Sequence, residues 1–194
     1  MKLGARAVIH GDRLGGACCE DETIVERDSG GCILLTSAVE AEKIVEALSR
    51  ALTVNIPTAP GTVSREGSRI VSWLSPRSWL AHTAANEADD VIEAVGRAFP
   101  ERRVHASYYS DHICWFDIEG KGAEALLRQG GFISLERAGL PLDAIKRTLV
   151  AGIPLLVWRC AKNVWRLGVE RSRADYFVNW MIETQKDNSG RVVG

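Results

Sequence analysis

The sequence predicts an α+β protein built from two similar split β-α-β (ferredoxin-like) halves packed together. Two observations support this fold class. First, the order strand, turn, strand, helix occurs twice, and Trp79 and Trp165 each begin the second strand of one copy. Second, a residue that can cap a helix follows each tryptophan at the same spacing, Asn86 in the first copy and Ser172 in the second. Matched tryptophans, caps and helix positions indicate an internal repeat.

The later copy has the clearer pattern. Residues 149–158 form an apolar run that is too short to span a membrane and has the length of a buried strand. Residues 165–170 alternate apolar and polar side chains, as a strand with one buried face does. Ser172 with Asp175 predicts a capping box at the start of a helix. One face of that helix repeats at helical spacing through Phe177, Trp180, Met181 and Thr184.

The rest of the first half is interpreted in the same way. Residues 32–35 predict a short strand, and Ser37 with Glu40 predicts a capping box before a helix. The buried face of that helix consists of Ile44, Val45, Leu48 and Leu52. Residues 55–67, with two prolines and two glycines, predict a loop, and residues 70–74 predict the strand ahead of Trp79. The helix after Asn86 is expected to end at Phe99-Pro100.

In the second half, residues 112–118 predict a strand and residues 119–129 a helix ended by Gly130-Gly131. A short extended piece at 132–135 and a turn or short helix at 140–146 precede the apolar strand. The predicted organisation has four parts: an irregular N-terminal arm at 1–31, a first α+β half at 32–102, a second at 103–185, and a flexible tail at 186–194.

Bulk composition excludes some classes of function. With 24 basic and 25 acidic residues among 194, the chain has no basic excess, which argues against a nucleic-acid partner. No apolar run is long enough for a membrane helix, so no membrane partner is expected. The five cysteines have no framework spacing and are expected to be reduced thiols. These features predict a cytoplasmic protein.

Motifs for catalysis and cofactor binding are weak. Residues 120–125 read G-x-G-x-x-A between a strand and a helix, which could accept a pyrophosphate only within a regular strand-helix-strand unit. The repeat predicts another topology, so a loosened turn is favoured. Ser110-Asp111-His112 is interpreted as a turn, because adjacent side chains seldom point at one another. The histidines and cysteines lack ligand spacing for a metal. We therefore predict no catalytic, cofactor-binding or metal residues.

The candidate site residues are Trp158, Arg166, Arg171 and Arg173, which surround the last predicted strand pair. Arginine can bind a carboxylate through two parallel hydrogen bonds, as the glutamate tail of a folate would require. A solvated surface beside a capped helix is the alternative. Six tryptophans in a chain of this size suggest that some lie in a subunit contact, where tryptophan is enriched. The four residues are therefore predicted to form an interface.

Four segments of the chain resemble a known family. They are Trp115–Leu127, Leu155–Arg159, Val169–Asp175, which is similar to a Val-Pro-Arg-Ser-aromatic-Ala signature, and Trp73–Leu80, which is similar to Leu-Gly-Pro-x-x-Trp-Leu. The family is the gamma subunit of heterotetrameric sarcosine oxidase, a relative of the folate-dependent aminomethyltransferase of glycine cleavage. Where the family has Gly-Cys-Pro-x-Asp-Leu, this chain has Gly130–Leu135 without the aspartate, which marks a divergent member.

The resemblance implies an aminomethyltransferase-like fold and a non-catalytic subunit of an amine-oxidising flavoenzyme. Such a complex demethylates sarcosine oxidatively and passes the one-carbon unit to tetrahydrofolate. The partners it implies are the alpha, beta and delta subunits, chiefly alpha. FAD, FMN, NAD and tetrahydrofolate are expected in those partners and not on this chain. The alternative is a free-standing folate-binding aminomethyltransferase-like or tRNA-modification protein.

Overall fold

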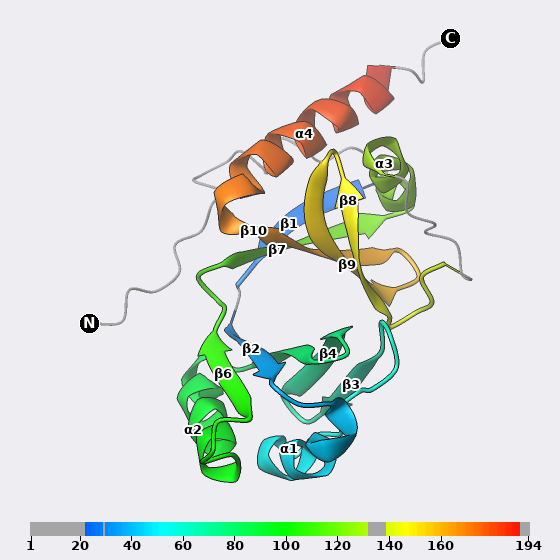
Figure 1. Ribbon diagram of the computed structural model, residues 1–194. Coiled ribbons are helices and arrows are strands. Elements are labelled where there is room, and N and C mark those ends of the chain that lie inside the picture. Colours follow the sequence, from blue (N-terminus) through cyan, green and yellow to red (C-terminus); the bar gives the residue numbers. More distant parts are fainter. Residues whose placement is uncertain (1–21, 29, 132–138, 191–194) are drawn as a thin grey trace. The chain divides into compact units, whose positions relative to one another are not determined.

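The computed structural model describes residues 22–28, 30–131 and 139–190, which belong to two compact units (Figure 1). The first unit is Ser29–Asp111, and the second unit is Met1–Asp28 together with His112–Gly194. Each unit contains one five-stranded sheet in which the strand pairings are antiparallel. This arrangement confirms the predicted α+β class.

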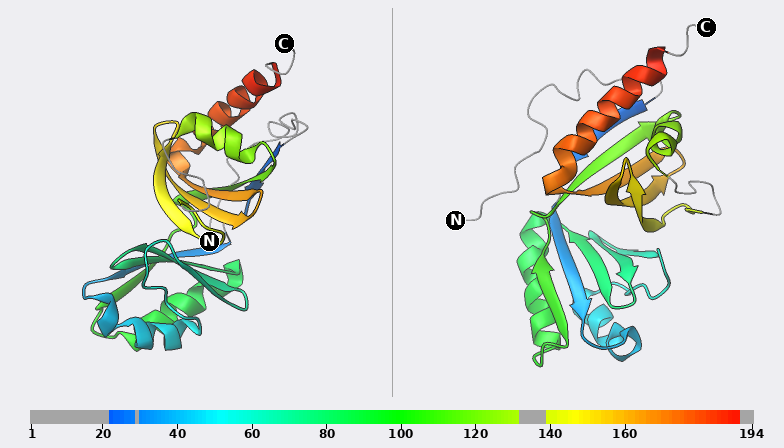
Figure 2. Two further views of the ribbon diagram at one scale, coloured as in Figure 1. Left: turned by 90° about the vertical axis from the view of Figure 1, so that its right-hand side faces the viewer. Right: turned by 45° about the horizontal axis from the view of Figure 1, so that its top comes forward.

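The sheet of the first unit has the strand order β3-β4-β5-β2-β6. Its elements in chain order are β2 (Gly31–Ser37), η1 (Ala41–Lys43), α1 (Val45–Leu52), β3 (Val63–Glu66), β4 (Arg69–Ser75), β5 (Ser78–Thr83), η2 (Ala85–Glu87), α2 (Ala88–Ala98) and β6 (Val104–Tyr108). Helices α1 and α2 lie on one face of the sheet, as the views in Figure 2 show. Trp79 is fully buried under them, and its indole N–H donates a hydrogen bond of 2.7 Å to the Pro57 carbonyl.

The sheet of the second unit has the order β1-β7-β10-β9-β8. Its elements are β1 (Glu22–Arg27), β7 (Ile113–Gly120), α3 (Ala123–Gly130), β8 (Ile145–Val150), β9 (Ile153–Ala161), β10 (Val164–Glu170) and α4 (Arg171–Gly190). Helices α3 and α4 cover one face of this sheet (Figure 2). The core between them contains Phe116, Trp165 and Phe177. Phe177 stacks on Trp180, with ring centroids 5.5 Å apart.

The internal repeat is confirmed by the two sheet orders. The first unit's sheet, taken from its other edge, has the order β6-β2-β5-β4-β3. These strands correspond one by one to β1, β7, β10, β9 and β8 of the second unit. Trp79 is the second residue of β5 and Trp165 the second residue of β10, and both are fully buried. The tryptophans thus occupy equivalent places on equivalent strands, as predicted.

The predicted arm and domain boundaries are wrong in the described part of the chain. Residues 22–27 form β1, which pairs with β7, although residues 1–31 were predicted to be irregular. Among the described side chains of this strand only Ile24 is deeply buried, which gives too weak a pattern to be recognised. Residues 104–108 pair with β2 and so belong to the first unit, not to a second half that begins at 103. Helix α4 continues to Gly190, past the boundary predicted at residue 185. Residues 1–21 and 191–194 lie outside the described residues.

The predicted strand at 149–158 is also wrong, because it contains a turn. Strand β8 ends at Val150, Ala151 and Gly152 have φ values of 52° and 74°, and β9 begins at Ile153. Glycine adopts such positive φ values without strain, so the chain can reverse within an apolar run. Apolar residues on both sides of the turn hide it from periodicity. Similarly, β3 lies inside the predicted loop at 55–67, and β8 begins within the predicted turn or helix at 140–146. The piece predicted at 132–135 lies outside the described residues.

The predicted helix caps do not form. Ser37 is the last residue of β2, where its hydroxyl donates to the Val39 carbonyl at 2.7 Å and accepts from the Val39 N–H at 3.1 Å. Ser172 lies inside α4, which already begins at Arg171. Asn86 lies within η2, and α2 has no side-chain cap. Ser37 thus lies three residues before Glu40, which precedes η1, whereas Ser172 lies one residue past the start of α4.

Candidate functional site

A buried carboxylate lies at the centre of the second unit's sheet. Asp117 of β7 is opposite Val25 of β1 and Arg166 of β10, and its side chain is only 2% exposed. Arg166 donates two hydrogen bonds to it, from Nε to Oδ1 at 2.7 Å and from a terminal nitrogen to Oδ2 at 2.9 Å. Arg27, two residues after Val25, donates from Nε to Oδ2 at 2.8 Å. The carboxylate is therefore held between cations from two neighbouring strands.

The electrostatics of this group favour its charged form. Burial acts to raise the pKa of Asp117, but the hydrogen bonds and charge of Arg166, and then of Arg27, outweigh burial and lower the pKa below its ordinary value. The hydrogen bond to Asp117 likewise raises the pKa of Arg166. Arg27 also donates to the Glu119 carboxylate at 2.9 Å. Two arginines thus face two carboxylates, and no positive charge is left over in the group.

Trp158 continues this row across the sheet. It lies opposite Arg166 on β9, and the Arg166 guanidinium stands 5.6 Å from the centroid of its ring. The indole N–H of Trp158 donates to the Asp143 carboxylate at 3.1 Å. Because Trp158 is 1% exposed, it supports Arg166 from within the protein and does not itself reach the surface. All six tryptophans lie in the described residues. Trp73 and Trp180 are half-buried, and the other four are buried.

The other two predicted residues lie apart from this row. Arg171 begins α4, and its backbone N–H donates to the His112 carbonyl at 2.9 Å. Arg173 is about half exposed and forms an ion pair with Glu170 at 3.4 Å. Arg166 and Glu170 are four residues apart on β10, about 13 Å along an extended strand. The four predicted residues therefore form two groups, Trp158 with Arg166 and Arg171 with Arg173.

Asp117, Arg27 and Glu119 were not among the residues predicted for the site. One signal was present: an aspartate inside Ile113–Gly120, a strand whose other residues up to Ile118 are apolar and buried on both faces. Such a charge needs a buried partner. The partner Arg27 is 90 residues away in sequence, in a segment with no clear pattern, so the pairing could not be derived.

The geometry limits the chemistry of the remaining motifs. Gly120 has a φ of 125°, which only glycine adopts readily, but β7, α3 and β8 do not form the parallel unit that a dinucleotide site requires. The Ser110 hydroxyl accepts from the Cys32 N–H at 2.9 Å and donates to the Gly30 carbonyl at 3.0 Å.

Across the described ranges, no group of three His, Cys, Asp or Glu side chains could hold a metal ion. In the same ranges no helix is long and apolar enough to cross a membrane.

Comparison with known proteins gives a consistent result. The model of the sarcosine oxidase gamma subunit family matches residues 37–187. The chain is 27% identical over 148 residues to the sarcosine oxidase subunit gamma of Corynebacterium sp. U-96, covering 76% of this chain and 71% of that protein. It is 24% identical over 143 residues to the same subunit from strain P-1, covering 73% and 69%.

Two solved structures are similar to this one. A chain of the heterotetrameric sarcosine oxidase from Corynebacterium sp. U-96 superposes with a TM-score of 0.77 and 25% identity, covering 86% of this chain and 84% of that one. The glycine cleavage system aminomethyltransferase T from Bartonella henselae has a TM-score of 0.61 at 12% identity, covering 84% and 45%. The second likeness shows the fold alone, and it confirms the predicted aminomethyltransferase-like architecture.

Proposed function

The chain belongs to the sarcosine oxidase gamma subunit family, and from this premise we propose that it is the non-catalytic gamma subunit of a heterotetrameric, amine-oxidising flavoenzyme. The complex demethylates sarcosine oxidatively and transfers the one-carbon unit to tetrahydrofolate. The family match over residues 37–187 is the observation that carries this proposal. The matched residues include most of both units, so the match does not depend on a single motif.

The charge balance of the Asp117 group supports a structural role. A folate tail would need an arginine whose hydrogen-bonding fork is free. In Arg166, Nε and one terminal nitrogen already donate hydrogen bonds to Asp117. Arg27 donates to both Asp117 and Glu119. The group therefore holds β1, β7 and β10 together and is poorly suited to bind an external carboxylate. We assign FAD, FMN, NAD and tetrahydrofolate to the partner subunits. These are alpha, beta and delta, and alpha is proposed as the chief contact of this chain.

Arg171 and Arg173, at the start of α4, remain proposed contact residues, because both reach solvent at least in part. Arg166 contributes to a contact only through the exposed part of its side chain, 31%, while Trp158 supports it from below. The cytoplasmic location and the absence of nucleic-acid or membrane partners remain predictions.

Affinity purification of the tagged chain from its native organism tests the proposal. We expect a large flavin-containing partner to be recovered, and sarcosine oxidation in the recovered complex. The isolated chain should show no flavin absorbance and no turnover of sarcosine, with or without tetrahydrofolate. Turnover by the isolated chain would instead support the free-standing enzyme.

A further inference from the structure

Among the strands that the structure describes, β8 is an edge of the second unit's sheet. It pairs with β9 on one side, and on the other side only Val150 has a bridge, to Gly131, within the described residues. The Arg159 N–H donates to the Ala144 carbonyl at 3.0 Å, and hydrogen-bonded positions alternate along an antiparallel pair. The backbone groups of residues 146 and 148 therefore face β9. Those of Ile145 and Arg147 point outwards, where another strand could bond to them.

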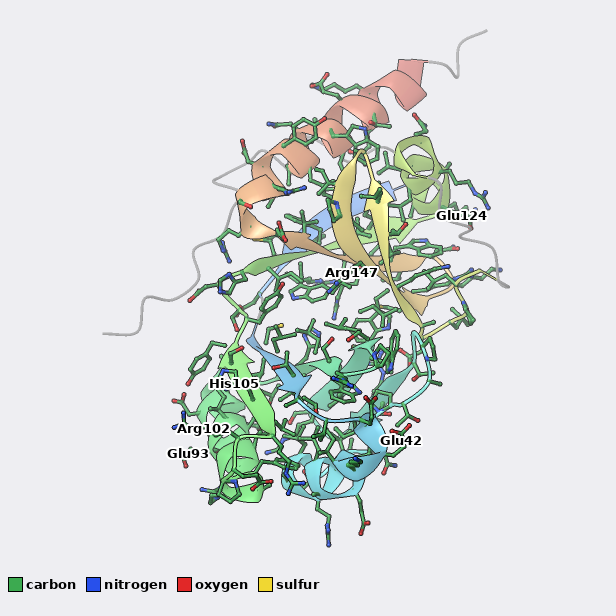
Figure 3. All side chains as sticks on the ribbon, viewed as in Figure 1. Glu42, Glu93, Arg102, His105, Glu124 and Arg147 are labelled. Carbon is green, nitrogen blue, oxygen red and sulfur yellow. The ribbon has the colours of Figure 1, made fainter. Side chains whose placement is uncertain are left out.

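This edge is basic and has no acidic residue of its own. From residue 144 to residue 169 the sequence contains no Asp or Glu, but it contains Lys146, Arg147, Arg159, Lys162 and Arg166. Arg166 is bound to Asp117, and Arg159 lies 4.9 Å from the ring centroid of Trp165. Lys146 and Arg147 (the latter labelled in Figure 3) are exposed, and neither has an ion pair or side-chain hydrogen bond within the described part of the chain. Among the described residues, the two cations on β8 therefore have no counter-charge.

The two cations flank the open edge from both faces of the sheet. Val150 points into the core under α3 and α4, so Lys146, four residues earlier, shares its face. Arg147 lies on the other face, opposite Leu156. A strand added beside β8 would send alternate side chains towards Lys146 and towards Arg147. Leu142 and Leu149, each just over half exposed, would provide apolar contacts near the two ends of this edge.

We propose that β8 is a docking edge that takes up an acidic, extended segment of the large partner subunit by strand addition. Main-chain hydrogen bonds from Ile145 and Arg147 would supply affinity, and the two cations would select acidic side chains. A second copy of this chain does not fit, because pairing β8 with itself brings Lys146 and Arg147 of both copies together. This inference rests on the proposed function, since the partner is that of the flavoenzyme.

Charge reversal with a matched control tests the role of the cations. The variant Lys146→Glu with Arg147→Glu is compared with Lys121→Glu together with Lys162→Glu, which makes the same charge change in the exposed turns before α3 and between β9 and β10. Each full-length tagged chain is expressed in the native organism, and the recovered flavoprotein is quantified. We expect the β8 variant to recover about tenfold less flavoprotein, or still less, and the control to match the wild type. Equal unfolding midpoints of the purified chains would show that both fold.

A second pair of variants separates the backbone from the charge. Arg147→Pro removes an outward N–H while sparing the bonds to β9, and edge strands tolerate proline. It should recover less flavoprotein than Arg147→Ala. Carbodiimide coupling in the wild-type complex should join the Lys146 amine to an Asp or Glu of the large subunit, as identified by mass spectrometry.

The outcomes distinguish the two proposals. If the wild type and the β8 charge-reversal variant recover equal flavoprotein, or if coupling joins the large subunit to Lys121 or Lys162 and not to Lys146, the docking edge is wrong and the proposed function stands. If the wild type recovers no flavoprotein, both are wrong.

Discussion

In the first unit Leu34 of β2 lies opposite Leu80 of β5, whereas at the equivalent register of the second unit Asp117 of β7 lies opposite Arg166 of β10. Trp79 and Trp165 establish the equivalence, because each pairs with the residue after Leu34 or Asp117, namely Leu35 or Ile118. One topology therefore accepts either an apolar pair or an ion pair at the same place. The fold itself therefore does not require the Asp117 group.

The two units also differ in the origin of the outer strand. In the first unit β6 follows α2 directly, so its pairing with β2 closes a unit that is continuous in sequence. In the second unit β1 occupies that place and comes from the other end of the chain. The side-chain link between Arg27 and Asp117 spans 90 residues. We infer that the ion pair fixes the register of this distant strand, in which Ile24 is the one deeply buried residue among the described side chains.

The largest expected effect comes from replacing the Asp117–Arg166 ion pair of the second unit with a leucine pair like that of the first unit. Asp117→Leu alone should lower the free energy of unfolding by about 3–5 kcal/mol, because Arg166 loses its buried partner. Asp117→Leu with Arg166→Leu should recover most of that loss, since an apolar pair can replace a buried ion pair. Chemical denaturation measures both.

Glu119→Leu is the matched control, because this carboxylate is on the same strand but 43% exposed. It should cost about 1 kcal/mol or less. A double variant that is no more stable than Asp117→Leu would show that the two units are not interchangeable at this register.

A smaller effect is expected from pH. The pKa of Asp117 is lowered in the folded state, so its contribution to stability is fully present above the unfolded pKa of about 3.9 and is lost as pH falls through the folded value. The stability difference between the wild type and Asp117→Asn should be constant from pH 7 to about pH 5 and shrink below about pH 4. Leu34 and Leu80 do not titrate, so the first unit has no such dependence at this position. A difference that persists unchanged to pH 2 would contradict the assigned cause.

The smallest effects concern the two serines that resemble helix caps, one in each unit. Ser172→Ala should change the free energy of unfolding by less than about 0.5 kcal/mol, because Ser172 is exposed and lies inside α4. Ser37→Ala should cost about 1 kcal/mol, because its hydroxyl bonds both backbone groups of Val39. Thermal unfolding of the two variants side by side gives the comparison. A larger loss for Ser172→Ala would mean that Ser172 caps α4 after all.

The sequence was sufficient to predict the features that depend on local pattern. The buried faces of α1 and α4, and the matched positions of Trp79 and Trp165, follow from periodicity and spacing. The turn at Ala151–Gly152 does not, because apolar residues continue on both sides of it. Strand β1 could not be predicted either, since what holds it is Asp117, far away in sequence. The site was only partly predicted for the same reason. Arg166 was predicted to be a site residue, but its ion pair with Asp117 was not predicted.

Native mass spectrometry of the complex purified from the native organism tests whether this chain is the gamma subunit of a heterotetramer. We expect an assembly of four different chains in which this 21.2 kDa chain is present, together with a flavin-containing large subunit. Recovery of this chain only as a monomer, or only as an assembly of its own copies, would contradict the assignment to the gamma subunit of a heterotetrameric oxidase.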